Sequence, residues 1–583
     1  MRRLQRLAEV TCRGCWIGWS IFAVRRPWAL LAANLVLLAA SLAIAITGAD
    51  GLPIGSLAPS GSSSGEPDLI VATTGDASAR SPLYRVALRV ISSQVEADSA
   101  VARVQQGPVS ADGRSTSLLV SFSGIDATER KDAVERIEAG IDPGPLDVTY
   151  GGEVATLLEA RHDLAGDLWK LELLALPFVA VVLGLALGPR LAAAPLLCAA
   201  TAISGTLAVL VLIGLVTSVS LLGIAPGAVV GLVLGVQAPC SYFARFRAEA
   251  MRVPPDEANR RAVIAAAELA VPVGVAATLV TTGLLATDLN QAGSMIVACA
   301  LAAGLALAST LVCAPAIVSL AAGDGHLEGE AAIWLERRPA AAVGFLARSA
   351  ARTAAFVALG VILMAAAAVP LLHGDTAPFS AADLPADSAA RAAATVAHVN
   401  PGNEGGGSLF ADLPLAAGVT AVAMALVFGL GFRARRTAIP LALASLLPAA
   451  AAVGLCVLVF QEGHLAGAIN QESQGALETG AVASLLTALV SVSAARSAAF
   501  LQASRDIHSL GLEPGWTAYS AASLALPAAI VASLVGGAMT GVLAGADLYA
   551  AREFGLAVTV GLLFDVILLR PAQLAALARW GSH

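Results

Sequence analysis

Asp565 is the one clear carboxylate well inside the last apolar stretch of this chain, so it is the first candidate for chemistry. An ionisable side chain within a membrane span is costly and is usually kept to carry a proton or to contact a substrate. The alternative is a structural acid near the end of its span, bonded to a neighbouring helix or paired with Arg570. Because Arg570 lies five residues on, off the i,i+3/i+4 face, we expect it to extend toward the lipid headgroups instead.

Three further polar side chains lie in apolar stretches and allow two interpretations each. Tyr242 is either an anchor at the membrane interface, which we expect, or a member of a relay. Ser491 and Ser493 either hydrogen-bond to the preceding helical turn, which we expect, or contribute to a path for protons or substrate. None of the three alone indicates a reaction.

Signatures of an enzyme or of a metal site are missing from the sequence. We find no nucleophile elbow, P-loop or zinc pattern, and the seven histidines show no metal-ligand spacing. Cys12 and Cys15 form a single CxxC without a second pair, which is a weak metal signal. We therefore predict that the chain is not an enzyme and binds no cofactor or metal.

Composition places the chain in a membrane. It has 583 residues, of which 57% are hydrophobic and 13% are charged, and its net charge of −7 argues against binding nucleic acid. Apolar stretches long enough to cross a bilayer occur as one lone stretch, a polar block and then five closely spaced stretches. The same 1+5 arrangement follows a second time, which predicts about twelve spans. We place these spans near 28–47, 172–188, 192–217, 222–244, 262–286, 293–321, 353–372, 414–432, 438–460, 477–495, 518–542 and 553–570.

Arginine placement predicts the orientation of these spans. Six arginines precede the first span, and further groups follow the fourth span (Arg245 to Arg261) and the eighth (Arg433 to Arg436). By the positive-inside rule both termini are cytoplasmic and the two polar blocks are extracytoplasmic. The low lysine content favours a bacterial source, so we expect a multi-pass protein of a bacterial plasma membrane.

The larger polar block is expected to fold by itself. After a Gly/Ser/Pro-rich loop (Gly51–Pro67), its pattern indicates a β-α-β-β-α-β order, which predicts a small α/β domain of ferredoxin-like type. The second block holds at most one helix (Ser388–His398) and a glycine-rich turn (Gly402–Gly407), too little for a matching domain. The predicted organisation is 1–49 cytoplasmic N-terminus and first span, 50–165 extracytoplasmic domain, 166–325 spans two to six, 326–372 cytoplasmic linker and seventh span, 373–412 truncated extracytoplasmic segment, and 413–583 spans eight to twelve.

The chain resembles the MMPL (mycobacterial membrane protein Large) branch of the RND superfamily. Members of this branch are proton-driven exporters of lipids and other hydrophobic molecules. The stretch from Phe554 through Asp565 and Arg570 to Pro571 is similar to the last span of that family. Four other stretches also resemble it, and together they extend over nearly the whole chain: Arg25-Arg26-Pro27, Gly152 to Leu174, Arg245-Phe246-Arg247 and Asp383 to Ser388. We therefore predict an all-α polytopic membrane protein in two 1+5 pseudo-repeats, which should be parallel because six spans separate their starts. It departs from the family in having one small α/β domain, since the family's second extracytoplasmic domain is almost absent.

The resemblance also implies a proton relay that this sequence lacks. The family carries an Asp-Tyr pair in the fourth span and another in the tenth. By position these should fall at Gln237-Ala238 and at Ala488-Leu489, and none of these side chains titrates near pH 7. Gln237 keeps the capacity to hydrogen-bond a water or a neighbouring span, and Pro239 is expected to kink its helix.

Two functions remain open from the sequence. One is a transporter that moves a lipid or another hydrophobic substrate to the cell envelope, with Asp565, Gln237, Tyr242 and Ser491 as candidates for the proton or substrate path. The other is a transport-incompetent relative that serves as an accessory or scaffold of the envelope. The expected partners are membrane lipids, the hydrophobic substrate, and either other envelope proteins or a second copy of the chain.

Overall fold

The structure is a computed structural model of the full chain. It describes residues 15–48, 67–123, 127–215, 221–287, 289, 292–321, 330–377, 379–385, 387–398, 409–432, 434–464 and 476–580. Three features predicted from the sequence lie wholly or almost wholly outside these residues: Cys12, the loop Gly51–Pro67 apart from its last residue, and the turn Gly402–Gly407.

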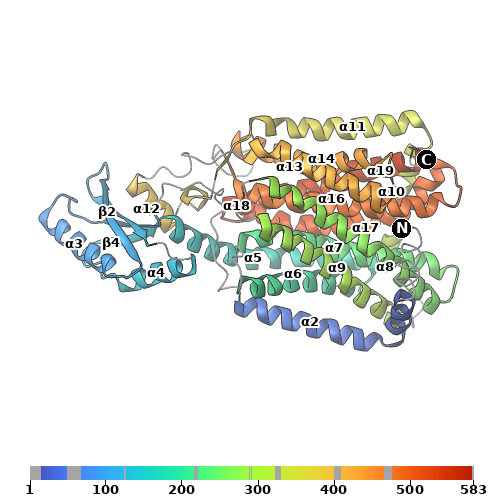
Figure 1. Ribbon diagram of the computed structural model, residues 1–583, viewed down its shortest axis with the longest axis horizontal. Helices are drawn as coiled ribbons and strands as arrows, with labels where there is room; N and C mark the ends of the chain where they lie inside the picture. The colour runs from blue at the N-terminus through green and yellow to red at the C-terminus, as the bar shows by residue number, and fades with distance from the viewer. Residues whose placement is uncertain are drawn as a thin grey trace.

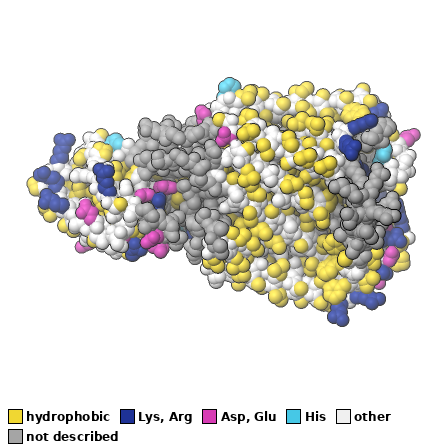
Figure 2. All heavy atoms as spheres, viewed as in Figure 1, with side chains coloured by type: hydrophobic (Ala, Val, Ile, Leu, Met, Phe, Trp, Pro, Cys, Tyr) yellow, Lys and Arg dark blue, Asp and Glu magenta, His cyan; other side chains and the backbone are white. Residues whose placement is uncertain are grey.

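Most of the described chain forms a bundle of long apolar helices. Eleven of the described helices are long and apolar enough to cross a membrane. The predicted second span is the end of the 35-residue helix α5 (Glu153–Leu187), and its apolar part, Glu172–Leu187, is shorter than the other eleven. Figure 2 shows apolar side chains over the bundle, with charged side chains at its far end and on the opposite domain. The spanning helices are α2 (Pro27–Gly48), α6 (Ala193–Gly214), α7 (Ala225–Ala250), α8 with η3 (Pro255–Ala286), α9 (Ala292–Ala321), α11 with η5 (Ala350–His373), α13 with η7 (Leu409–Gly431), α14 with η8 (Ala438–Gln461), α16 (Thr479–His508), α17 with η9 (Pro514–Gly545) and α18 to α19 (Tyr549–Trp580).

The two halves of the bundle are built alike. In Figure 1, α2 and α11, the first spans of the two halves, lie along opposite outer edges. α2 packs on α6 and α9, and α11 packs on α14 and α19, which hold equivalent places in the second half. The most buried spans are α7 and α16, which occupy equivalent places in the interior.

Small residues let the interior helices approach closely. A Cβ at Gly235 of α7 would lie 2.6 Å from the Cα of Ala199 on α6, and one at Gly227 would lie 2.8 Å from the Cβ of Ala298 on α9. Lipid tails are as apolar as leucine, so helices in a bilayer associate through such close packing and through polar contacts. The high glycine and alanine content therefore positions α6, α7 and α9 against one another.

A small domain stands at one end of the bundle, which we call the domain end, and the two labelled chain ends lie at the opposite end (Figure 1). The predicted β-α-β-β-α-β order is confirmed, and the strands form an antiparallel sheet in the order β2-β3-β1-β4. Leu69 and Val71 of β1, one of the two inner strands, pack on Tyr84 and Leu88 of α3. The elements are β1 (Leu69–Thr74), α3 (Pro82–Glu96), β2 (Val101–Val109), β3 (Ser115–Phe122), α4 (Ala127–Gly140) and β4 (Asp147–Gly151).

The second polar block covers the other face of this sheet. Its helix α12 (Ala389–Ala397) packs Ala393 and Ala397 against Ile70 and Ala72 of β1. The segment is thus too short for a domain of its own, but it completes the first domain. Glu159 of α5 fixes the start of α12, because its carboxylate accepts hydrogen bonds from the backbone N–H groups of Ala389 (3.0 Å) and Ala390 (2.9 Å).

We predict that Glu159→Ala loosens α12 from the sheet. The substitution removes a carboxylate that caps two N–H groups at a helix N-terminus, a contact that contributes about 1 kcal/mol. Trypsin cleavage after Arg391, followed by mass spectrometry of that fragment, should rise roughly fivefold as the opened population grows. Glu135→Ala is the matched control, because Glu135 is exposed and its ion pair within the described residues is with Lys131 on the same helix. Equal cleavage of Glu159→Ala and wild type would show that the cap does not hold α12.

Candidate functional site

A charged network lies in the middle of the bundle. Arg496 is near the centre of α16, and Asp565 is the first residue of η10 (Asp565–Leu569), a turn that joins α18 (Tyr549–Phe564) to α19 (Arg570–Trp580). Arg570 follows that turn. Arg496 and Arg570 are 0% exposed and Asp565 is 2% exposed. Two guanidinium cations and one carboxylate are therefore enclosed together by protein.

The Asp565 carboxylate accepts hydrogen bonds from three side chains. Its Oδ2 accepts from Nη1 of Arg496 (2.7 Å) and Nε of Arg570 (3.1 Å). Its Oδ1 accepts from Nη2 of Arg570 and from Oγ of Ser493 (3.0 Å). A carboxylate that is withdrawn from water needs this number of donors, because an unsatisfied buried charge is severely destabilising.

The expectation that Arg570 extends to the headgroups is wrong, and the backbone explains why. Residues Asp565–Leu569 form a π-helical turn, in which the N–H of Arg570 donates to the carbonyl of Asp565. A π turn bonds residue i to i+5, so two residues five apart lie close together, as they do not in an α-helix. The pair with Arg570, which α-helical spacing did not favour, is thus formed within the span.

Serines and a glutamine take the remaining donors of Arg570. Its Nη2 donates to Oγ (2.6 Å) and the carbonyl (3.0 Å) of Ser493, and its Nη1 donates to Oγ of Ser497 (2.8 Å) and to Gln573. Ser497 is also 2.8 Å from Oγ of Ser445 on α14. The expected back-bonding is wrong for Ser493, which binds the charged pair. It is also wrong for Ser491, whose buried hydroxyl makes no hydrogen bond within the described residues.

Gln237 of α7 joins the same network, at the position where the resemblance placed an acid. Its Oε1 accepts from Nε of Arg496 (2.8 Å), so it holds a neighbouring span, one of the two partners expected for it. Nη2 of Arg496 donates to the carbonyl of Ala529 on α17 (3.3 Å). Ala488 and Leu489, the corresponding positions of α16, are buried apolar side chains. The network therefore connects α7, α16, α17 and the last span through one acid and two arginines.

Tyr242 lies elsewhere, and its side chain is enclosed by protein rather than exposed at the surface of the bundle. It is 1% exposed, and its hydroxyl donates to the side chain and carbonyl of Asn259 on α8. Asn259 in turn donates to Pro315 (3.0 Å) and Ser319 (2.9 Å) of α9. The anchor interpretation is therefore wrong, since Tyr242 connects α7 to two neighbouring helices. It is not among the hydrogen-bond partners of Asp565.

Sequence reasoning missed Arg496. The predicted tenth span ended at residue 495, whereas α16 continues to His508 and places Arg496 near its middle. A signal was present, because small and apolar residues continue past Arg496 to Leu501.

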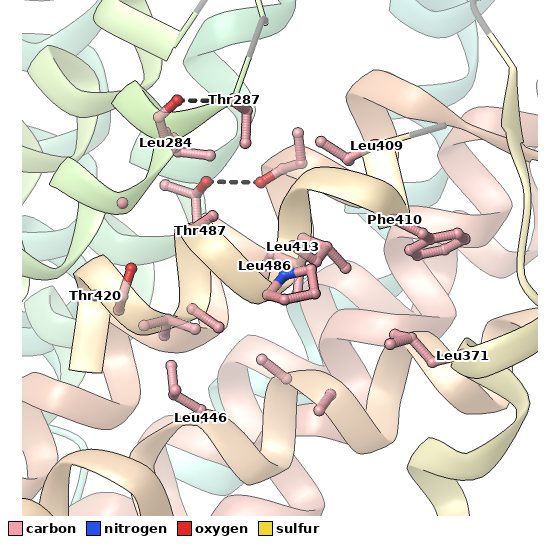
Figure 3. A pocket seen from close by; sticks show the side chains of 18 of the residues that line it. Leu284, Thr287, Leu371, Leu409, Phe410, Leu413, Thr420, Leu446, Leu486 and Thr487 are labelled. Atoms are coloured by element: carbon pink, nitrogen blue, oxygen red, sulfur yellow. Dashed lines mark hydrogen bonds between the residues drawn. The ribbon is translucent and has the colours of Figure 1, made fainter. Parts of the chain in front are cut away.

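An apolar cavity of about 530 Å³ opens beside the network in the half of the bundle nearer the domain end (Figure 3). Leu371, Phe410, Leu413 and Leu446 are among the side chains that surround it. Threonine hydroxyls on its wall are already bonded to backbone carbonyls: Thr487 to Ala483 (2.6 Å), Thr287 to Leu284 (2.7 Å) and Thr420 to Val280 (3.1 Å). The wall therefore offers a ligand apolar contacts and few free polar groups.

The cavity and the charged network share two helices. Val490 of α16 lines the cavity, and Ser493, one turn further, binds Asp565. Leu446 of α14 lines the cavity, and the adjacent Ser445 contacts Ser497 of the network. Chemically, only Asp565 of this network can change its protonation state, because arginine does not deprotonate in proteins. Among the residues that the structure describes, no group of three His, Cys, Asp or Glu side chains is placed to hold a metal ion.

Comparison with known proteins agrees with the resemblance found in the sequence. Residues 70–355 match the sequence model of the MMPL family, so the predicted resemblance to this family is confirmed. None of the curated proteins compared with the chain matches it.

Two solved structures superpose on the chain. The crystal structure of SecDF from Thermus thermophilus, described as a translocon-associated membrane protein, superposes with a TM-score of 0.54 at 14% identity, over 93% of this chain and 99% of that one. SecDF in its super-membrane-facing form gives a TM-score of 0.49 at 14% identity, over 98% of both chains. The first of these confirms a polytopic membrane fold, and at this identity it bears on the fold alone.

We predict that Asp565→Asn destabilises the protein by about 3–5 kcal/mol, because it leaves two buried arginines without an anion. Thermal unfolding of the purified protein measures the loss. Asp506→Asn is the matched control: Asp506 pairs with Arg245 at 3.0 Å, but both side chains are partly exposed, so the loss should be about 1 kcal/mol or less. Similar melting temperatures for the two variants would show that the buried network does not stabilise the bundle.

We predict that Arg496→Gln is less harmful than Asp565→Asn. Removing Arg496 leaves the pair of Asp565 with Arg570, whose charges balance, whereas removing Asp565 leaves two cations. The same unfolding measurement should rank wild type first, Arg496→Gln second and Asp565→Asn last. If Arg496→Gln unfolded at the lower temperature, charge balance would not be the determining property of the network.

Proposed function

We propose that this MMPL-type membrane protein is an RND-type transporter that moves a lipid or another hydrophobic substrate to the cell envelope. The observation that carries this proposal is the apolar cavity of about 530 Å³ within the spanning part of the bundle, next to a buried ionic network. A cavity of this size and lining is in the range of sites for small apolar ligands. It is large enough for part of an acyl chain.

The network supplies a means of coupling that differs from the family's pair of acids. While Asp565 is ionised, it connects Ser493 and Arg496 on α16 to Arg570 on the last span. A proton on Asp565 would remove one charge and weaken these contacts. Val490 of the same helix lines the cavity. A shift of this helix would therefore change the shape of the site where substrate binds. We propose Asp565 as the coupling residue.

An accessory or scaffold role is the second candidate. It is favoured by Gln237, which occupies the position of a relay acid and accepts a hydrogen bond from Arg496. A network of this kind, with its donors satisfied, can hold helices together without any cycle of protonation. This candidate predicts that substitutions in the cavity and at Asp565 leave the phenotype unchanged while the protein is present in the membrane.

We predict that a strain without this protein retains a lipid in its plasma membrane that wild type delivers to the outer envelope. Extraction and mass spectrometry of the two fractions measure this. Ala450→Phe, which fills the cavity from α14, should fail to restore delivery. Leu443→Phe, which introduces the same ring on the same helix at a 54% exposed position outside the cavity, should restore it. Protein abundance in the membrane is measured for each strain.

Asp565→Asn completes this series. Loss of delivery at normal protein abundance supports coupling through Asp565. An unchanged lipid profile in the deletion strain, with every variant behaving as wild type, would reject the transporter and leave the scaffold.

The proposed orientation places both termini in the cytoplasm of a bacterium and the sheet domain outside its plasma membrane. In a background with Cys12 and Cys15 replaced by serine, a membrane-impermeant maleimide should label Ser93→Cys in spheroplasts. It should label Met251→Cys only after permeabilisation, because this exposed residue lies at the opposite end of the bundle. Labelling of Met251→Cys without permeabilisation would reverse the orientation.

A further inference from the structure

A second cavity, of about 300 Å³, lies between the two halves of the bundle. It is enclosed by α5, α6, α7, α16, α17 and α18, near the domain end of most of these helices. Ile203, Leu232 and Phe554 contribute to an apolar wall, while Glu172 and Glu478 also line it. None of its lining residues, all of which the structure describes, is basic. The cavity thus differs from the first one in having an acidic side.

Glu478 is the buried acid of this cavity. It lies directly before the spanning part of α16 and is 3% exposed. Its carboxylate accepts from the backbone N–H groups of Gly480 (2.8 Å) and Ala481, which satisfies the start of the helix. Its own N–H donates to Oε2 of Glu553 on α18 (3.0 Å). Burial raises the pKa of Glu478 to about 8.

The charged groups that face Glu478 are acids. Glu553 is 2% exposed, Asp383 is 8% exposed and interacts electrostatically with both glutamates, and Glu172 lies across the cavity. Arg552, next to Glu553 in the sequence, donates to the carbonyl of Ala546 instead. Among the described residues no basic side chain acts on Glu478 or Glu553, so a positively charged ligand is favourable when either of these two buried acids ionises.

Ser484 provides an independent sign of a ligand. It lies on α16 beyond the capped turn, lines the cavity and is only 3% exposed. Within the described residues its hydroxyl makes no hydrogen bond, whereas Thr487 on the same helix bonds to the preceding turn. A buried hydroxyl without a partner on the wall of a cavity is available to a polar group inside it.

The polar and apolar parts of the wall are separated along the membrane normal. Glu478 is at the end of α16, whereas Leu232 lies two turns inside α7 and Ile203 lies near the middle of α6. A ligand that filled the cavity would therefore place a polar head near the domain end and an apolar tail toward the middle of the bundle.

We propose that this cavity binds an amphiphile that carries a protonated primary amine on a single alkyl chain, with the ammonium group held by Glu478 and Ser484. The ammonium offers three donors, which suits a carboxylate and a hydroxyl together. If the proposed transport function is correct, the proposal narrows the substrate class to cationic amphiphiles; the binding itself does not depend on transport. A neutral lipid of the same length would offer no counter-charge to the ionised form of Glu478.

Binding of octylamine and octan-1-ol to the purified full chain in phosphatidylcholine nanodiscs tests this, with empty nanodiscs subtracted in isothermal titration calorimetry. Octylamine should bind saturably, at least tenfold more tightly than octan-1-ol. Its affinity should rise roughly 25-fold from pH 6.5 to pH 8.5, because Glu478 ionises through about 8 while an alkyl ammonium, like lysine at about 10.4, stays charged.

Variants separate the site from unspecific partitioning. Glu478→Gln should lower octylamine affinity at least tenfold and remove the rise with pH. Ser484→Ala should lower it severalfold and keep the rise. Ala450→Phe in the other cavity should change neither. Equal binding of octylamine and octan-1-ol, or an unchanged affinity in folded Glu478→Gln, would overturn the proposal. If Glu478→Gln does not fold, a flat pH profile or unchanged binding in Ser484→Ala overturns it.

The outcome is distinguishable from that of the transport experiment. Saturable, pH-dependent octylamine binding together with an unchanged lipid profile in the deletion strain would support the site and reject transport. Loss of lipid delivery without octylamine binding would support transport and reject this ligand.

Discussion

The pairing of Asp565 with Arg496 and Arg570 is the constraint on which the centre of the bundle depends. Each of these side chains is almost completely buried, and a charge removed from water must be matched by an opposite charge and by hydrogen bonds. The partners come from α7, α14, α16, α17 and the last span, so these helices have to meet at one depth along the axis of the bundle. The geometry of the interior is set by the need to satisfy the charges as much as by apolar packing.

Close packing makes this arrangement possible. Glycines and alanines bring α6, α7 and α9 together, and on another side of α7 Gln237 accepts a hydrogen bond from Arg496 of α16. A longer side chain at Gly235 or Gly227 would push α7 away from α6 or α9. Small residues and buried charges therefore have complementary roles. Small residues allow the helices to approach, and buried charges fix the depth along the bundle axis at which the helices meet.

The sequence was a good guide where periodicity determines structure and a poor one where tertiary contacts do. The strands and helices of the sheet domain and eleven of the apolar spans follow from hydrophobic patterns, and these predictions were confirmed. The pair of Asp565 with Arg570 depends on a π turn, which has no periodic signal, and the position of Tyr242 depends on Asn259. Arg496 was overlooked because an arginine after an apolar run is usually found at the end of a span. The contact of α12 with the sheet joins segments more than 200 residues apart, which no local pattern can show.

The sheet domain has two attachments of different kinds. One is the continuous helix α5, which extends from the first polar block into the first half of the bundle, and the other is α12, which follows the first span of the second half. A domain held by a single linker can rotate freely, but one held by both halves cannot. A displacement of one half relative to the other must therefore tilt the sheet or detach α12. The orientation of the domain, on one side of the membrane, therefore depends on how the two halves are arranged within the membrane.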